Sequence, residues 1–403
     1  MKNNTERICK VFINIGVVSL AVSVVFSITL MNIAFGFLFV GFLGLVYTKK
    51  LKLFSTGLEL PIGLFLFFYI LSALVNGSLS GVDSIRDNYW YIFHMYLVVY
   101  LFNEKEMGKF IKVLKWSTVG ISVYAILQSL VGLTFNLNFN IGGTIKMISP
   151  PLIEIARCKG HSFYIGTGIM GHQSTFGVQV LMLIFLVYAG FKRKLWALLP
   201  VTALFLTFVY GAWIGFLISV LIYLIVKGKK IAAVSYIFII LISLFLVFPS
   251  KTVRLRQAVK QKAAACKQAA RVYVNHPVFG TGPGNYREVF KSENPKEDYK
   301  PIHSTYADIL IEGGLLTFLA FCFFIYRFIT LYLRIPYSSK ERWRKLHKSS
   351  WFALIAVFIM GFFRNYLIDA ENAVLVWTIA GIIIKTKKSK WTRRLISSRD
   401  NMY

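Results

Sequence analysis

Acidic residues are scarce in this sequence of 403 residues, which has 17 Asp and Glu against 46 Lys and Arg. Charged residues of both signs make up only 16% of the chain and hydrophobic residues make up 56%, whereas an ordinary soluble domain has about 25% charged residues. This apolar content excludes intrinsic disorder, and a soluble fold could not bury so much apolar surface. The scarcity of charge therefore favours a membrane protein.

Cysteine and glycine are also too few for two other classes of protein. Four cysteines exclude a small disulfide-stapled scaffold, and 29 scattered glycines exclude a collagen-like fibre. A multi-spanning membrane protein is the class that fits this composition.

Long apolar runs are abundant, and they predict an all-α polytopic membrane protein with about twelve transmembrane helices. A bilayer core of about 30 Å is crossed by about 20 apolar helical residues, so we divide the chain at each charged or turn-rich break. The run over 12–46 is too long for one helix and is divided near 30–32. The predicted spans are 9–28, 30–48, 58–76, 89–103, 111–133, 172–191, 195–210, 212–226, 231–249, 304–333, 351–368 and 373–386.

Most Lys and Arg residues fall in connections that share one face of the predicted bundle. Basic residues near helix ends resist translocation, so this face is expected to be cytoplasmic and to carry both termini. The first apolar run lacks a signal-peptide cleavage site and is expected to stay in the protein. The formal net charge of +29 then reflects topology in the cell membrane, and we expect no nucleic-acid partner.

The predicted spans divide the chain into five parts: 1–133, N-terminal helices; 134–171, a first outer loop; 172–249, central helices; 250–303, a large basic outer loop; and 304–403, C-terminal helices with a basic cytoplasmic tail. The large loop between spans 9 and 10 has 11 Lys and Arg but only four Asp and Glu. Topology does not require cations on this side, so the loop favours an anionic ligand. The alternative is that the loop binds no anion, because long loops are translocated regardless of their charge.

Residues 251–275 contain neither Gly nor Pro and predict a helix in the large loop. At 100° per residue, a cationic stripe forms one side of this helix. The stripe consists of Arg256, Lys260, Lys267 and Arg271. Lys262 lies instead on the neighbouring apolar side with Leu255, Val259, Cys266, Ala270 and Tyr273, where its ammonium either snorkels to lipid headgroups or meets an anion.

Two motifs follow the predicted helix. The first, His276–Tyr286, has three glycines in five residues, which form either an anion-binding nest of backbone amides or a simple turn. The second begins at His303, at the mouth of the tenth span, and places Asp308 and Glu312 on one helical face. Ionisable groups gathered at a helix mouth indicate function, although a lone interfacial histidine is often structural.

The two motifs together resemble the signature of the O-antigen ligase and polymerase family. The shared positions are His276-Pro277, Phe279-Gly280, Gly282, Gly284-Asn285-Tyr286, His303, Tyr306, Leu310, Glu312 and Gly314-Leu315. Weaker matches are Arg157 with Gly160, and Gly171-His172-Gln173, so that the resemblance covers roughly residues 155–385. It implies a GT-C-like membrane architecture with a large helical outer loop.

The resemblance implies an inverting glycosyltransferase whose donor is a glycan on a polyprenyl diphosphate. Its partners would be this lipid-linked donor, an acceptor glycan, the bilayer and possible chain-length regulator and flippase proteins. A polymerase of repeat units for a capsule, exopolysaccharide or O-antigen is our first hypothesis, and a ligase that moves the glycan to a lipid, protein or wall acceptor is the second. A flippase or transporter is disfavoured, because such proteins place ionisable residues near the bilayer midplane, and in the first nine spans His94 is nearly the only candidate inside an apolar run, with Glu59 at an edge.

The resemblance also implies roles for individual residues. His303 inherits the catalytic histidine, with Glu312 or Asp308 positioning it. The expected diphosphate- and glycan-binding residues are Lys262, Arg256, Arg271, Arg157, His172, Gly282, Gly284, Asn285 and Tyr306. Cations can stabilise the leaving diphosphate without a metal, so we expect no cofactor; a metal held by His303, Asp308 and Glu312 is the alternative.

Two positions depart from the family pattern. Tyr210 stands where members usually have an arginine before a Gly-Ala-Trp turn, and Lys262 replaces an arginine fourteen residues before the His-Pro pair. Lysine keeps the charge but loses the bidentate fork. Separately, Cys158 and Cys266 both fall in the predicted outer loops, where a disulfide is permitted but not established by sequence.

Overall fold

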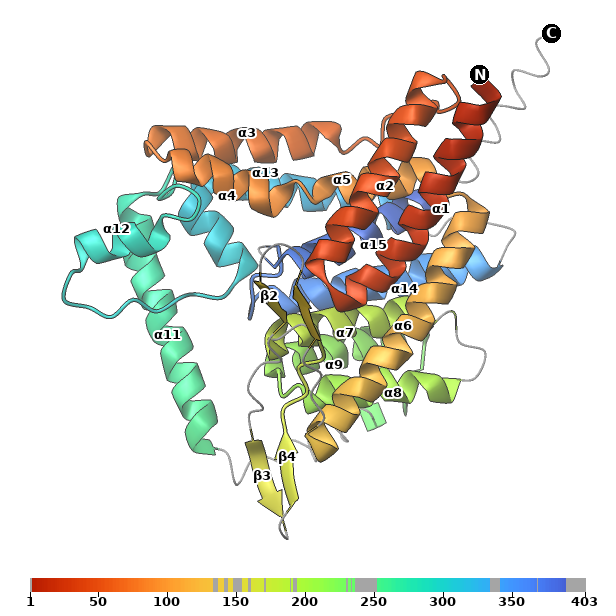
Figure 1. Cartoon of the computed structure of the whole chain (residues 1–403). Coiled ribbons are helices and arrows are strands. Elements are labelled where there is room, and N and C mark those ends of the chain that lie inside the picture. Colours follow the sequence, from red (N-terminus) through yellow and green to blue (C-terminus); the bar gives the residue numbers. More distant parts are fainter. Residues whose placement is uncertain are drawn as a thin grey trace.

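A computed structural model of the chain shows a bundle of helices (Figure 1). It describes residues 2–132, 137–140, 144–147, 154–158, 161–169, 172–188, 190, 194–229, 231–232, 234–235, 252–333, 341–367 and 369–388. In the strands, and over 252–259, the backbone alone is described for nearly every residue.

Helices occupy every predicted span except 231–249, most of which lies outside the described residues. The helices of the bundle are α1 (Lys2–Phe26), α2 (Ile28–Tyr47), α3 (Glu59–Val75), α4 (Leu79–Tyr89), α5 (Ile92–Leu101), α6 (Glu104–Val131), α7 (Gln173–Tyr188), α8 (Leu198–Leu206), α9 (Tyr210–Val226), α13 (Thr305–Tyr332), α14 (Glu341–Met360) and α15 (Ala370–Lys388). The division of the first apolar run is confirmed, because α1 ends at Phe26 and α2 begins at Ile28.

Four helices, α1, α2, α6 and α13, are long and apolar enough to cross a membrane. Helices α3, α7, α8 and α9 are apolar but shorter. The helical, membrane-type fold is thus confirmed, while the count of twelve spans stays a prediction.

The core of the bundle is formed by neighbours that are distant in sequence. Helix α13 packs against α3, α15 against α5, and α14 against α7, α9 and α15. α1 packs against both α2 and α6. Because α7, α13, α14 and α15 meet within one apolar core, the chain segments at their ends are brought together.

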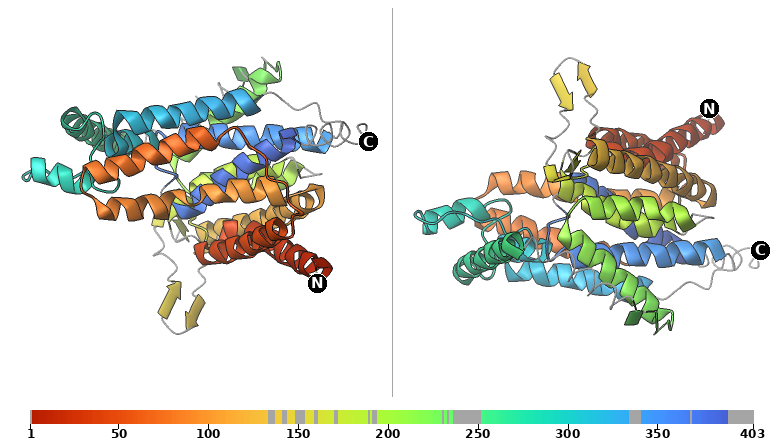
Figure 2. Two further views of the ribbon diagram at one scale, coloured as in Figure 1. Left: turned by 90° about the horizontal axis from the view of Figure 1, so that it is seen from above. Right: turned by 90° about the horizontal axis from the view of Figure 1, so that it is seen from below.

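Two further helices lie at one end of this bundle (Figure 2). They are α11 (Thr252–Asn275), which confirms the helix predicted over 251–275, and α12 (Tyr286–Glu293). They share a small second core with the residues around the start of α13; its members are Ala265, Ala269, Val272, Tyr286, Phe290, Ile302 and Ile311. α1 begins and α15 ends at the opposite end of the bundle (Figure 2).

The buried side of α11 differs from the predicted one. Cys266 and Ala270, expected on the apolar side, are exposed, whereas Gln268 is buried. The reason is tertiary, since the Gln268 side chain donates to the Asp298 carbonyl at 2.9 Å and accepts from the Lys300 amide at 3.1 Å. Contacts with residues 298–300, which precede α13, therefore determine which side of α11 is buried.

Two antiparallel hairpins add short strands to a fold that we expected to be all-α. Strand β1 (Leu137–Asn140) pairs with β2 (Thr144–Met147), and β3 (Glu154–Cys158) pairs with β4 (His161–Tyr164). Both hairpins fall in the loop over 134–171. Cys266 is a free thiol, so the disulfide that the sequence left open is not formed in this structure.

Candidate functional site

His303 occupies an unusual backbone position directly before α13. Its φ of 49° lies in the left-handed region, which few residues other than glycine adopt. The turn is fixed from α14, because the Thr305 amide and the Ser304 hydroxyl donate to the Gly361 carbonyl at 2.9 and 3.2 Å. Such a conformation persists only where surrounding contacts impose it, and it is typical of functional sites.

Lys262 reaches the same turn from α11. Its ammonium donates to the carbonyl of Ile302 and, at 3.0 Å, to the carbonyl of His303. Partial burial lowers the pKa of Lys262. The structure therefore brings Lys262 and His303 together, and the lysine contacts the backbone that carries His303.

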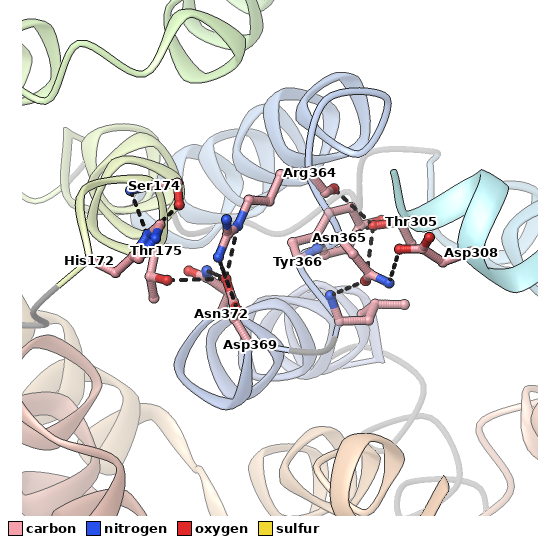
Figure 3. Close-up of polar contacts among 11 residues, drawn as sticks. His172, Ser174, Thr175, Thr305, Asp308, Arg364, Asn365, Tyr366, Asp369 and Asn372 are labelled. Atoms are coloured by element: carbon pink, nitrogen blue, oxygen red, sulfur yellow. Dashed lines mark hydrogen bonds and ion pairs between the residues drawn. The ribbon is translucent and has the colours of Figure 1, made fainter. Parts of the chain in front are cut away.

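The segment between α14 and α15 contacts the first turn of α13, directly after His303 (Figure 3). The Thr305 hydroxyl donates to the Arg364 carbonyl and accepts from the Tyr366 amide, both at 3.2 Å. The Asn365 amide donates to the Asp308 carboxylate at 2.8 Å. These bonds tie residues 364–366 to the first turn of α13.

Arg364 and Asp369 form an ion pair inside this segment. The guanidinium Nη2 lies 3.1 Å from a carboxylate oxygen of Asp369, and Nε lies 3.3 Å from the same oxygen. The Thr175 hydroxyl on α7 also donates to that oxygen, at 3.1 Å, and the Asn372 amide on α15 at 3.3 Å. Both side chains of the pair are only 20% exposed, and the carboxylate of Asp369 is held by side chains from α7 and α15.

The ring of His303 lies close enough to these cations to be influenced by them. Partial desolvation lowers the pKa of His303, and the charges of Arg364 and Lys262 lower it further. These effects favour the neutral imidazole, the form that can accept a proton. Its side chain is exposed, and no described residue hydrogen-bonds its nitrogens.

His172 precedes α7 and faces the same cluster (Figure 3). Its Nδ1 accepts from the Ser174 amide at 3.3 Å and lies 2.6 Å from the Ser174 hydroxyl. Partial burial and the Arg364 charge lower the pKa of His172. The sequence resemblance had included His172 only as a weak match, and the structure places it near Arg364 and His303.

The two carboxylates expected to position His303 have other partners. Asp308 accepts from Asn365, and Glu312 accepts from the Tyr69 hydroxyl at 3.2 Å. Glu312 follows His303 by nine residues, which is about 13 Å along a helix. Neither bond joins a carboxylate to the imidazole; Asp308 is bonded instead to Asn365. The described residues contain no group of three His, Cys, Asp or Glu side chains able to hold a metal ion, and the trio His303, Asp308 and Glu312 is not such a group.

The glycine-rich motif packs against the backbone of α13. The Thr281 and Gly282 amides donate to the carbonyls of Ile311 and Glu312 at 2.9 and 3.0 Å. These amides are therefore engaged within the protein, which favours the turn interpretation at Gly282 over the anion nest. Gly284 is exposed with a φ of 75°, and the Asn285 amide donates to the Gly282 carbonyl at 3.2 Å.

Close backbone approach explains why glycines stand at two positions of the motifs. Gly314 interrupts α13 with a φ of 73°, and a Cβ there would lie 2.2 Å from the Val278 carbonyl oxygen. A Cβ on Gly280 would lie 2.4 Å from the Ile311 carbonyl oxygen. The spacing of the two motifs thus fits a glycine-to-glycine contact between the loop and the kinked helix.

The other expected binding residues are spread around this centre. The Tyr306 hydroxyl donates to the Phe358 carbonyl at 2.7 Å and packs α13 on α14. Arg271 pairs with Glu297 at 2.7 Å on the exposed side of α11. The side chains of Arg157 and Arg256 lie outside the described residues, and Tyr210 packs against Trp213 at the start of α9.

Sequence reasoning missed Arg364, Asp369 and Asn365. Their signal was available, because Arg364 is an ionisable residue near the end of the predicted span 351–368 and Asp369 lies in the break after it. Nothing in the linear sequence, however, joins this break to the motif at His303.

A comparison with known families agrees with this geometry. Residues 195–322 match the family model described as O-antigen ligase. This stretch of the chain is therefore similar to the O-antigen ligase family. The matched stretch includes Lys262, the glycine-rich motif and His303, whereas Arg364 lies beyond it. Among curated proteins, none matches the chain.

Proposed function

We propose that this O-antigen ligase-like protein is a membrane glycosyltransferase that joins polyprenyl-diphosphate-linked oligosaccharide repeats into a surface polysaccharide. The family match supports a membrane function of the ligase or polymerase type. One observation carries the residue-level proposal: an exposed His303 stands in a fixed left-handed turn, and the charge of the partly buried Arg364 lowers the pKa of its imidazole.

In the proposed reaction, His303 takes the proton from the acceptor hydroxyl as its oxygen attacks the anomeric carbon. The bond between that carbon and the diphosphate oxygen breaks, and the configuration is inverted. Negative charge then grows on the departing diphosphate, where preorganised cations stabilise it without a metal.

Arg364 is the proposed cation for the departing diphosphate. Its Nε and Nη2 donors face Asp369, which leaves Nη1 of the planar guanidinium directed away from that carboxylate. Asp369, Thr175 and Asn372 hold this group in place. His172 contributes a further polar group at the rim, and Arg256, Arg271 and Arg157 remain predicted contacts of the donor.

Lys262 has a positioning role in this proposal. Its bonds to the carbonyls of Ile302 and His303 hold the turn that presents the imidazole. Asp308 and Asn365 support the same turn from the opposite side.

Product analysis tests the proposed function. Purified protein in lipid nanodiscs is given a single lipid-linked repeat unit, with or without a second acceptor. A ladder of lengths from the repeat unit alone supports a polymerase. Transfer only when the second acceptor is present would establish the ligase instead, and no transfer with any lipid-linked glycan would refute both.

A further inference from the structure

A second basic region lies at the end of the bundle opposite His303. A cavity of about 760 Å³ opens between the first turns of α6, the residue Gly190 after α7, and the first turns of α14. Its cations are Lys105, Lys109, Lys112, Lys115 and Arg342, and it also contains Glu104. We call it the basic cavity. In Figure 2 the beginnings of α6 and α14 lie at the end where α1 begins.

The cations of the basic cavity are poorly matched by carboxylates. Among the described residues, no ion pair joins Lys105, Lys112 or Arg342 to Asp or Glu, and the Lys109 ammonium donates to the Asn14 amide oxygen at 2.6 Å. Like charges gathered around one space repel each other unless an anion enters it. The cavity therefore favours a negatively charged ligand.

The inner wall of the basic cavity is apolar. Met107 and Ile111 of α6 and Trp343 and Leu346 of α14 are buried side chains that line it. A ligand that satisfies both walls has an anionic group and an apolar part. Free inorganic phosphate or a nucleotide phosphate would satisfy only the cations.

Aromatic side chains beside the cavity indicate its depth in the membrane. Trp116 and Trp196 are 50% and 41% exposed, and their rings meet at 5.8 Å. The Lys115 ammonium lies 4.8 Å from the Trp116 ring. Exposed tryptophans next to lysines are typical of the level of the lipid headgroups. The cavity thus lies where phospholipid phosphates are abundant.

We propose that the basic cavity is a binding site for the headgroup of an anionic phospholipid, with Lys105, Lys112 and Arg342 around the phosphate and the apolar wall against the acyl chain. Basic pockets between membrane helices bind such headgroups. The site is independent of glycosyl transfer, because its residues lie at the far end from His303.

Native mass spectrometry after incubation with equal amounts of phosphatidylglycerol and phosphatidylethanolamine tests the site. The wild-type protein should retain phosphatidylglycerol selectively. The triple variant Lys105→Gln, Lys112→Gln, Arg342→Gln should reduce this retention at least about tenfold, since each cation near a membrane surface contributes about 1 kcal/mol to binding an anionic lipid. The matched control Lys52→Gln, Lys227→Gln, Lys229→Gln removes three exposed cations outside the basic cavity and should change retention less than about twofold.

Three outcomes would overturn the proposal. They are equal retention of both lipids by the wild type, equal loss in the control variant, and displacement of phosphatidylglycerol by inorganic pyrophosphate alone, which would indicate a site for soluble phosphates. If the triple variant does not fold, the single changes Lys112→Gln and Arg342→Gln are used, and each should reduce retention by about two- to fivefold.

Discussion

The two ends of the bundle use basic residues in different ways. Near His303, each central cation already has a protein partner: Arg364 is paired with Asp369, and Lys262 donates to two backbone carbonyls. In the basic cavity, Lys105, Lys112 and Arg342 surround an open space without an ion pair among the described residues. The first arrangement preorganises a reaction centre, and the second fits a ligand that brings its own negative charge.

The largest expected effect follows from removing the imidazole of His303. His303→Ala should reduce glycosyl transfer by about 10²- to 10⁴-fold, which is the usual contribution of a positioned general base. His276→Ala is the matched control, because His276 lies in the same predicted loop, 250–303, but bonds Glu293 at 3.1 Å. Rates are measured from product formation per folded protein. Equal effects of the two variants would remove His303 from the mechanism.

The second-largest expected effect is that of substituting Arg364. Arg364→Gln removes the charge proposed to stabilise the departing diphosphate, and we expect kcat to fall by about 10²- to 10³-fold. Arg364→Lys keeps the charge but loses the planar fork, so it should recover only part of the rate. A change in donor KM with an unaltered kcat would mean that Arg364 binds the ground state only.

Substituting Lys262 distinguishes two roles of this residue: positioning His303 and binding the donor diphosphate. Lys262→Met removes two charge-assisted hydrogen bonds to the turn, and we expect kcat to fall about tenfold or more while donor KM stays near wild type. Lys267→Met is the control, since Lys267 is an exposed cation on the same helix. If Lys262→Met raises donor KM and leaves kcat intact, Lys262 contacts the diphosphate as the sequence first suggested.

Substituting Gly314 tests whether its close approach to Val278 stabilises the protein. A Cβ at Gly314 would collide with the Val278 carbonyl, so Gly314→Ala should destabilise the protein by about 1–3 kcal/mol. No atom lies within 4 Å of a Cβ built on Gly63, and Gly63→Ala is the control. The readout is the thermal unfolding temperature in detergent. An unchanged temperature for Gly314→Ala would contradict the close approach.

The smallest expected effect is a shift in pH dependence. Because protonated His303 cannot act as a base, transfer should fall as the pH drops through its pKa, which desolvation, Arg364 and Lys262 lower below the ordinary 6.5. Lys262→Met removes one of these cations and should move the acidic limb towards higher pH. The triple variant of the basic cavity should leave the limb in place. A shift of equal size in both variants would remove the distinction between the two regions.

Much of the local structure was predictable because it depends on patterns along the chain. Runs of apolar residues predicted the helices of the bundle, and the absence of Gly and Pro predicted α11. The prediction was wrong about the covered side of α11, where Gln268 is buried and Cys266 is exposed. A helical wheel shows which residues share a side, but the neighbouring chain decides which side is covered.

The site itself could be only partly predicted. The motif identified His303 and Lys262. The sequence also suggested that Glu312 positions the histidine, whereas in the structure Glu312 accepts a hydrogen bond from Tyr69. Asn365 and Arg364 were missed, because a hydrogen bond from residue 365 to residue 308 leaves no periodic signal.

Composition, apolar run length and motif spacing are properties of the linear chain, so the sequence alone indicated a helical membrane protein with a stretch similar to the O-antigen ligase family. Only the tertiary structure decided which charged groups surround His303. Packing of α7, α13, α14 and α15 brings Thr175, Arg364 and Asp369 to one place. The same packing occupies the amides of the glycine-rich loop and leaves the basic cavity open at the other end.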